Sequence, residues 1–163
     1  MWGGIQCQRW CFITWLVAYG KVFTRARLFS LGYSDDKSCV LCGGESETVE
    51  HLWFRCPYVS QVVDVVCAWI GISFRANSLH EWLDWFAHDK RPENTMFQCK
   101  LLALCAIVYF TWRARNVKLY FCNAGWLSLE CAMVIVKECK SRIETKCKVT
   151  NDGIRRWRNR LIL

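Results

Sequence analysis

A chain of 163 residues is long enough to fold around one hydrophobic core, and its 53% of apolar residues with only two prolines excludes an intrinsically disordered protein. The net charge of +8 comes from one half of the chain: residues 1–92 hold nine basic and nine acidic residues, whereas residues 93–163 hold thirteen and five. A basic half favours a polyanionic partner, most often a nucleic acid, although a solvated surface without a partner explains the charge equally well.

Helix signals recur along the chain and strand signals are scarce, so the sequence predicts an all-α fold. An apolar helix is expected at residues 5–19, and Thr24 has the position of an N-cap for a short helix that ends near Phe29. Gly32 follows this helix as a stop signal, and one or two helical turns are expected at residues 47–54.

Longer helices are expected from Pro57 onward. Pro57 fits the first turn of a helix that ends at Gly71, and Ser78 with Glu81 has the spacing of a capping box at the start of another. Further helices are expected at residues 93–121, 127–146 and 153–163.

The longest run without a charge, Leu101 to Trp112, has twelve residues and falls short of the ~20 that a membrane-spanning helix needs. We therefore expect a buried core helix there and no membrane partner. The charge balance changes near residues 88–94, which predicts two regions. Three cysteines and a histidine gather at residues 39–56, so the first region, residues 5–90, is predicted to be a zinc-binding domain with its metal site at 39–56. The second is a basic helical region at 91–163.

Twelve cysteines would indicate a disulfide framework in a secreted chain of this length. The N-terminus has no basic region ahead of its apolar stretch, so no signal peptide is predicted. If three cysteines bind a metal, nine remain, and an odd number cannot all pair within one chain. A reducing compartment, the nucleus or the cytoplasm, is therefore expected.

Cys39, Cys42, His51 and Cys56 form the pattern C-x2-C-x8-H-x4-C, which is typical of a zinc site. A C-x2-C turn lets two sulfurs reach one ion, and Gly43 directly after it permits a tight backbone curve. Four protein ligands close the site, so the zinc is expected to be structural rather than catalytic. The alternative interpretation is that Cys39 and Cys42 are ordinary buried thiols and that His51 is an ordinary surface imidazole.

The tetrapeptide YSDD, Tyr33 to Asp36, has the form of a polymerase motif in which paired carboxylates hold two metal ions. Such a site needs a third carboxylate, and none of the 34 residues before Asp35 is Asp or Glu. We therefore interpret Asp35 and Asp36 as loop residues, and no catalytic residue is predicted.

The stretches FITWLVAYGKVFTRARLFSLG and CVLCGGESETVEHLWFRCPYVSQVV resemble the zinc-binding domain that follows the reverse transcriptase of non-LTR retrotransposons, a family abundant in plants. The later YFTWRARNVKLYF is similar to the segment that trails this domain. Besides the four metal ligands, the positions in register are Phe12, Trp15, Leu16, Gly20, Thr24, Leu28, Glu47, Thr48, Leu52, Trp112, Arg115, Asn116 and Phe121. The resemblance implies Zn²⁺ as the cofactor and association with a polymerase and its nucleic acid, without polymerase activity in this chain.

The leading hypothesis is a zinc-stabilised module that binds RNA or single-stranded DNA through basic side chains, with Trp157 stacking on an unpaired base. The alternative for the terminal basic segment is an amphipathic helix that packs Trp157 on the core. The predicted contacts are Arg113, Arg115, Lys118, Lys140, Arg142, Arg155, Arg156, Trp157, Arg158 and Arg160.

A second hypothesis is a protein-interaction module that docks a reverse transcriptase or another copy of itself through an exposed patch of Trp82, Trp85 and Phe86. The chain could also be a relic of a retroelement without function. The alternative interpretation places these rings in the core. Catalysis is disfavoured because Cys67 has no activating base near it in sequence, so neither enzyme activity nor a small-molecule substrate is expected.

Overall fold

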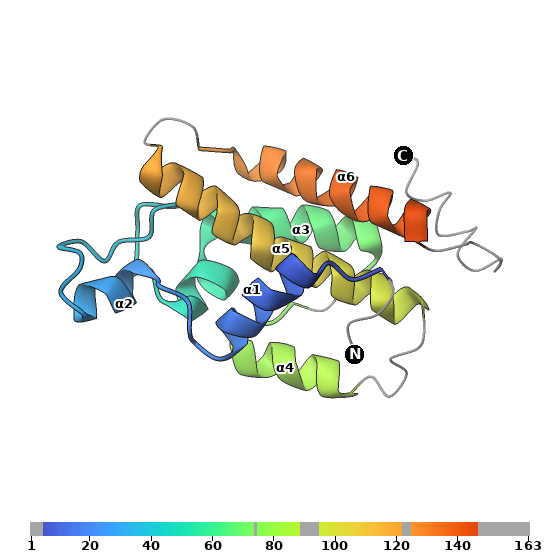
Figure 1. The fold of residues 1–163 in the computed structure, drawn as a ribbon, viewed down its shortest axis with the longest axis horizontal. Helices are drawn as coiled ribbons and strands as arrows, with labels where there is room; N and C mark the ends of the chain where they lie inside the picture. Colours follow the sequence, from blue (N-terminus) through green and yellow to red (C-terminus); the bar gives the residue numbers. More distant parts are fainter. Residues whose placement is uncertain (1–4, 74, 89–94, 122–124, 147–163) are drawn as a thin grey trace.

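The computed structural model describes residues 5–73, 75–88, 95–121 and 125–146, and this part of the chain is all-α, as predicted (Figure 1). Within it, the extended structure amounts to an isolated antiparallel bridge between Ser38 and Ser46. The elements, in order, are α1 (Gln8–Ala18), α2 (Arg25–Ser30), η1 (His51–Arg55), α3 (Pro57–Ile70), α4 (Leu79–His88), α5 (Thr95–Tyr120) and α6 (Ser128–Lys146).

Helix α5 runs through the middle of the protein and packs against α1, α3 and α6 (Figure 1). Twelve of its 26 residues are buried, and a single hydrophobic cluster extends from Ile5 to Ile143. The indole of Trp53 stacks on that of Trp112 and donates a 3.4 Å hydrogen bond to the Val108 carbonyl. Segments from both sides of the predicted division at residues 90 and 91 therefore share one core, while the division itself stays a prediction.

By length and composition alone, α5 is the helix among the described residues that could cross a membrane. This differs from what the twelve-residue uncharged run indicated, because the helix continues past Lys100 and Arg113 at its two ends. In this fold, however, 56% of its most apolar window is buried inside the protein. That burial is the pattern of the core helix expected from the sequence.

Local signals place the helix ends correctly. Pro57 occupies the first turn of α3, and Gly71 ends the helix in the left-handed region with φ of 71°. The Oγ1 atom of Thr24 accepts a 3.4 Å hydrogen bond from the Arg27 amide at the start of α2. At the start of α4, Glu81 donates its amide to Ser78, but its carboxylate accepts from the amide of Asn77, one residue earlier than in the standard capping box.

The predicted exposed patch of Trp82, Trp85 and Phe86 is wrong for Trp82, which is only 6% exposed. Its ring lies edge-on against Phe54, with 6.3 Å between the ring centroids, so it belongs to the core. Trp85 is half-buried and has an interaction partner, and the Phe86 side chain lies outside the described part of the structure. The alternative interpretation, a ring packed in the core, is therefore confirmed for Trp82.

Candidate metal centre and nucleic-acid surface

The C-x2-C turn is closed by its own backbone. The amide of Gly43 donates a 2.7 Å hydrogen bond to the carbonyl of Cys39, and the amide of Cys39 donates a 2.8 Å hydrogen bond to the carbonyl of Glu45. Gly43 has φ of 71°, a conformation that costs glycine nothing and strains other residues. The turn directs the thiols of Cys39 and Cys42 to the same centre.

His51 is the first residue of η1 and Cys56 follows directly after its last residue. The helical turn expected at this position is thus present, but η1 is a π-helix. Its defining bond runs from the Cys56 amide to the His51 carbonyl, at 2.6 Å. In an α-helix, residues five apart point roughly 140° away from each other, whereas the wider π turn brings them to one side. Pro57 then forces Cys56 out of the helical region, to φ of −65° and ψ of 124°.

The four predicted ligands meet at one point. The ligand atoms of Cys39, Cys42, His51 and Cys56 all lie within 4.8 Å of one another. The Cys39 and Cys56 sulfurs are 3.9 Å apart, and the Cys42 Sγ is 3.3 Å from the His51 Nε2. A tetrahedral zinc ion would require about 3.8 Å for the first distance and about 3.6 Å for the second. Three thiols and an imidazole are the donor set that zinc prefers, so these residues can hold one ion.

Burial and a hydrogen bond change the pKa values of the thiols at this site. Cys39, Cys56 and His51 are buried, and Cys42 is half-buried. The hydrogen bond between Cys39 and Cys56 raises the pKa of the Cys39 thiol and lowers the pKa of the Cys56 thiol. Metal affinity should rise with pH as the ligands lose their protons.

Glu45 orients the histidine. Its Oε2 lies 3.2 Å from the Nδ1 of His51, while the Nε2 faces Cys42. An imidazole that donates Nδ1–H to a carboxylate presents its Nε2 lone pair to the metal, as is common around metal-bound histidines. The sequence reasoning did not assign this role to Glu45; its place inside the spacer between Cys42 and His51 was the available signal.

A buried carboxylate joins the metal turn, residues 37–56, to the helices. Glu47 is fully buried and accepts hydrogen bonds from the amides of Arg25 at 2.9 Å and Val40 at 3.2 Å. Its Oε1 also accepts from both the Nε and the Nη2 of Arg115 on α5, at 3.0 and 2.7 Å. Together, these bonds fix the turn against α2 on one side and α5 on the other.

The position of Arg115 corrects its prediction as a nucleic-acid contact. The side chain is 1% exposed, and its guanidinium is held by Glu47 and lies 4.8 Å from the ring centroid of Trp112. A buried, paired guanidinium is out of reach of a phosphate group. The Nζ of Lys118, one turn later, donates a 3.0 Å hydrogen bond to the carbonyl of Leu41, so this residue also contacts the metal turn.

Arg113 and Arg142, by contrast, lie together with Arg9 in a cleft of about 680 Å³ that is formed by α1, α5 and α6. The guanidinium of Arg142 lies 4.9 Å from the ring centroid of Trp10. Its Nε atom is buried without a hydrogen-bond partner among the described residues. One acidic residue, Glu138, also lines the cleft. The structure thus brings two predicted contacts together and adds Arg9, which the charge count had assigned to the neutral half.

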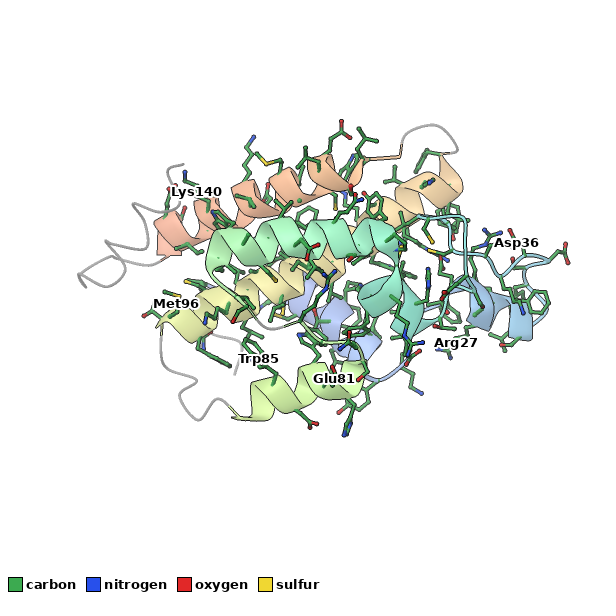
Figure 2. The ribbon with its side chains drawn as sticks, turned by 180° about the vertical axis from the view of Figure 1, so that it is seen from behind. Arg27, Asp36, Glu81, Trp85, Met96 and Lys140 are labelled. Atoms are coloured by element: carbon green, nitrogen blue, oxygen red, sulfur yellow. The ribbon has the colours of Figure 1, made fainter. Side chains whose placement is uncertain are left out.

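Of the remaining predicted contacts, Lys140 is among the described residues, and it does not line this cleft. Lys140 is half-buried on α6, at the opposite end of the molecule from Arg27 and Asp36 (Figure 2). Asp36 is exposed and accepts a 2.8 Å hydrogen bond from the Ser38 amide, as expected for a loop residue. The predicted terminal contacts lie outside the described residues: Arg155, Arg156, Trp157, Arg158 and Arg160.

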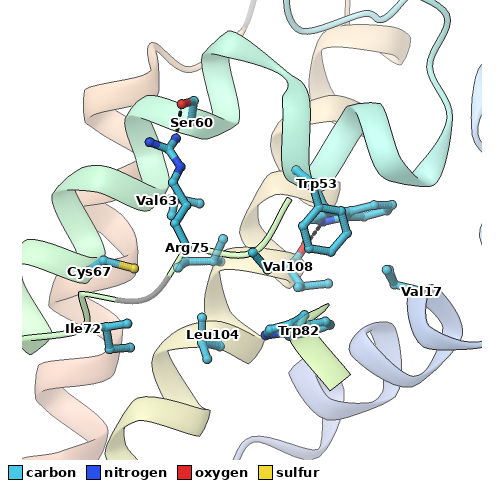
Figure 3. Close-up of a pocket in the computed structure, with 13 residues that line it drawn as sticks. Val17, Trp53, Ser60, Val63, Cys67, Ile72, Arg75, Trp82, Leu104 and Val108 are labelled. Atoms are coloured by element: carbon cyan, nitrogen blue, oxygen red, sulfur yellow. Dashed lines mark hydrogen bonds between the residues drawn. The ribbon is translucent and has the colours of Figure 1, made fainter. Parts of the chain in front are cut away.

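An apolar pocket of about 60 Å³ contains the thiol that was considered for catalysis, Cys67 (Figure 3). Burial raises the pKa of this thiol to about 11, the opposite of the shift that activates a nucleophile. The polar side chains that line the pocket are Ser60 and Arg75, which hydrogen-bond each other, and Arg75 also pairs with Asp64 at 2.8 Å. None of the lining residues is a histidine or a carboxylate that could act as the base.

Comparison with known proteins supports the assignment of the metal turn. The chain has no match among curated proteins or among solved structures. A family model described as zinc-binding in reverse transcriptase matches residues 1–62, which include all four metal ligands and end within α3. Arg115, the partner of Glu47, lies beyond the matched segment. The resemblance seen in the sequence is confirmed for this part of the chain: residues 1–62 match the zinc-binding domain of reverse transcriptases.

Proposed function

We propose that this protein is a nucleic-acid-binding module whose shape depends on one structural Zn²⁺, held by Cys39, Cys42, His51 and Cys56. It would derive from the region that follows the reverse transcriptase of a plant non-LTR retrotransposon and act without polymerase activity of its own. The partner is RNA or single-stranded DNA, in the nucleus or the cytoplasm.

The observation that carries this proposal is the cleft that contains Arg9, Arg113 and Arg142. Each guanidinium carries several N–H donors and can hold a phosphate group with two parallel hydrogen bonds. Cation–π contacts orient both guanidinium groups. That of Arg113 lies 5.3 Å from the ring centroid of Trp126, and that of Arg142 lies 4.9 Å from the ring centroid of Trp10.

A salt titration tests the proposal. Zinc-loaded protein is titrated against labelled single strands of RNA and DNA at increasing salt, and affinity should fall steeply because phosphate contacts release counterions. Arg113→Gln and Arg142→Met, which keeps the stem on Trp10, should each reduce the slope of log K against log salt by ~0.7. Arg75→Gln removes the same charge at the apolar pocket on another part of the surface and should leave the slope unchanged. Salt-independent affinity, or equal effects of all three changes, contradicts the proposal.

The second candidate is a protein-interaction module that docks a reverse transcriptase or another copy of this chain. Exposed Leu129 and Met133, one turn apart on α6, supply an apolar surface for it. Size-exclusion chromatography with cross-linking distinguishes the two: self-association that Met133→Lys abolishes supports the second candidate.

A further inference from the structure

We infer that the exposed aromatic stripe of α1, formed by Phe12, Trp15 and Tyr19, is a platform on which unpaired bases of single-stranded nucleic acid stack. These residues are 56%, 46% and 64% exposed. Their spacing of three and four residues places them along one face of the helix, opposite the buried Trp10 and Val17. This inference rests on the proposed function and adds both a second contact surface and a preference for single strands.

The three rings form a continuous surface. The centroids of Phe12 and Trp15 are 6.2 Å apart with planes inclined by 20°, and those of Trp15 and Tyr19 are 5.0 Å apart. From Phe12 to Tyr19 the helix rises about 10 Å, which matches about three bases at the ~3.4 Å stacking distance of a nucleic-acid strand. Stacking of bases on aromatic side chains tolerates any sequence because every base has a π-face.

Charge complementarity favours a polyanion on this face. Residues 1–34 contain Arg9, Lys21, Arg25 and Arg27 and no Asp or Glu. Arg9 lies three residues before Phe12 on α1. Beyond the other end of the stripe, the Nη1 of Arg27 donates a 2.8 Å hydrogen bond to the Gly20 carbonyl. Cations therefore flank the rings at both ends, where the phosphate groups of a stacked strand would continue.

The chemistry of the face also favours bases over an apolar protein partner. The aliphatic side chains of α1 are buried or half-buried, as Val17 and Leu16 are, so the large apolar side chains it exposes are aromatic. An apolar docking surface would use aliphatic side chains equally well, whereas stacking requires planar ones. Arg9 also lines the cleft with Arg113 and Arg142, which connects the stripe to the proposed phosphate contacts.

The experiment compares Trp15→Leu with Trp15→Phe in zinc-loaded protein. The probes are labelled oligo(dT), a blunt DNA duplex of the same length, and heparin, a polyanion without bases. Trp15→Leu should lower oligo(dT) affinity roughly tenfold, since each stacked base contributes strongly to single-strand binding. Affinity for the duplex and for heparin should stay unchanged, and Trp15→Phe should retain most of the oligo(dT) affinity. Tyr120→Leu, which removes an exposed ring at the end of α5, is the matched control and should change nothing.

Four outcomes overturn the inference. If the unsubstituted protein binds oligo(dT) in a salt-dependent way and Trp15→Leu binds it equally well, the platform is refuted while the proposed function stands. If Trp15→Leu weakens heparin binding as much as oligo(dT) binding, the ring does not act by stacking. If the protein elutes as a dimer that Trp15→Leu converts to a monomer, the stripe is an interface between copies. No binding to any probe refutes the proposed function and the platform together.

Discussion

The metal turn, residues 37–56, and the body formed by α1, α3, α5 and α6 are stabilised in different ways. The body buries apolar side chains: ten of the twelve buried residues of α5 are apolar. The turn buries thiols, an imidazole and a carboxylate, and its backbone is closed by hydrogen bonds such as that from the Glu47 amide to the Lys37 carbonyl, at 2.7 Å. We therefore expect so short a segment to depend on buried polar partners, and on a metal ion at its four ligands, to keep one conformation.

The two regions meet at a few identifiable contacts. Leu52 is fully buried in the shared core, Glu47 pairs with Arg115, and Lys118 donates to Leu41. The stack of Trp53 on Trp112 adds an apolar contact, so the metal turn is attached to α5 by aromatic packing as well as by charged and polar groups. Substitutions in the turn and in the body should separate these modes of stabilisation.

The largest effect is expected from loss of the metal site by Cys56→Ser. Zinc contributes about 10–16 kcal/mol to folding of small zinc-dependent domains, so residues 37–56 should lose their structure. Because the body has its own apolar core, α5 and α6 should keep their helical structure. Hydrogen exchange followed by mass spectrometry measures both regions, and native mass spectrometry should show that the bound zinc ion is gone.

Cys67→Ser is the matched control for this change. Cys67 is also a buried thiol, but it lies in the apolar pocket between α3 and α5. Its substitution should lower the stability of the body and leave one zinc ion bound. Protection of residues 37–56 in Cys56→Ser equal to that of the unsubstituted protein would show that the turn does not depend on metal.

The next largest effect is expected from Arg115→Met, which leaves the Glu47 carboxylate buried without its cation. Removing one partner of a buried ion pair typically costs about 3–5 kcal/mol. Urea denaturation should show this loss of unfolding free energy. The double variant Glu47→Gln with Arg115→Met leaves no buried charge and should recover part of it; a double variant less stable than Arg115→Met would contradict this explanation.

The sequence predicted what depends on neighbouring residues. The ends of α2 and α3 follow from Thr24, Pro57 and Gly71, because caps act within a few residues. The four metal ligands were identifiable because C-x2-C and H-x4-C place their donors by local backbone geometry alone. The same reasoning could not predict the π turn, because it results from joining a metal ligand to a following proline.

Contacts between distant residues were the ones that sequence reasoning missed. Glu47 and Arg115 are 68 positions apart, and nothing near Arg115 in sequence distinguishes a buried guanidinium from an exposed one. For the same reason, Arg9 was counted with the neutral half although it lies beside Arg113 and Arg142. Burial of Trp82 depends on packing against Phe54, which helix periodicity does not specify.

A smaller effect is expected from Glu45→Gln, which weakens the bond that orients the His51 ring. Loss of such a partner typically lowers metal affinity 10–100-fold, or about 1.4–2.7 kcal/mol, without removing a ligand. Competition with a chromogenic zinc chelator measures the affinity. Glu50→Gln removes the same charge from the exposed residue before η1 and serves as the control. Equal affinities of the two variants would contradict a role of Glu45 in orienting the His51 ring.

The smallest effect is expected from Thr48→Ala. The Oγ1 of Thr48 accepts a 3.0 Å hydrogen bond from the amide of His51, and it caps the turn that carries this ligand. Loss of a cap costs about 1 kcal/mol. Ser78→Ala removes an equivalent hydroxyl, which accepts from the Glu81 amide at the start of α4. Only Thr48→Ala should weaken zinc binding in the chelator assay, by roughly fivefold, because the Thr48 cap positions a metal ligand. The cap of Ser78 stabilises α4, which buries Trp82 in the apolar core and carries no metal ligand.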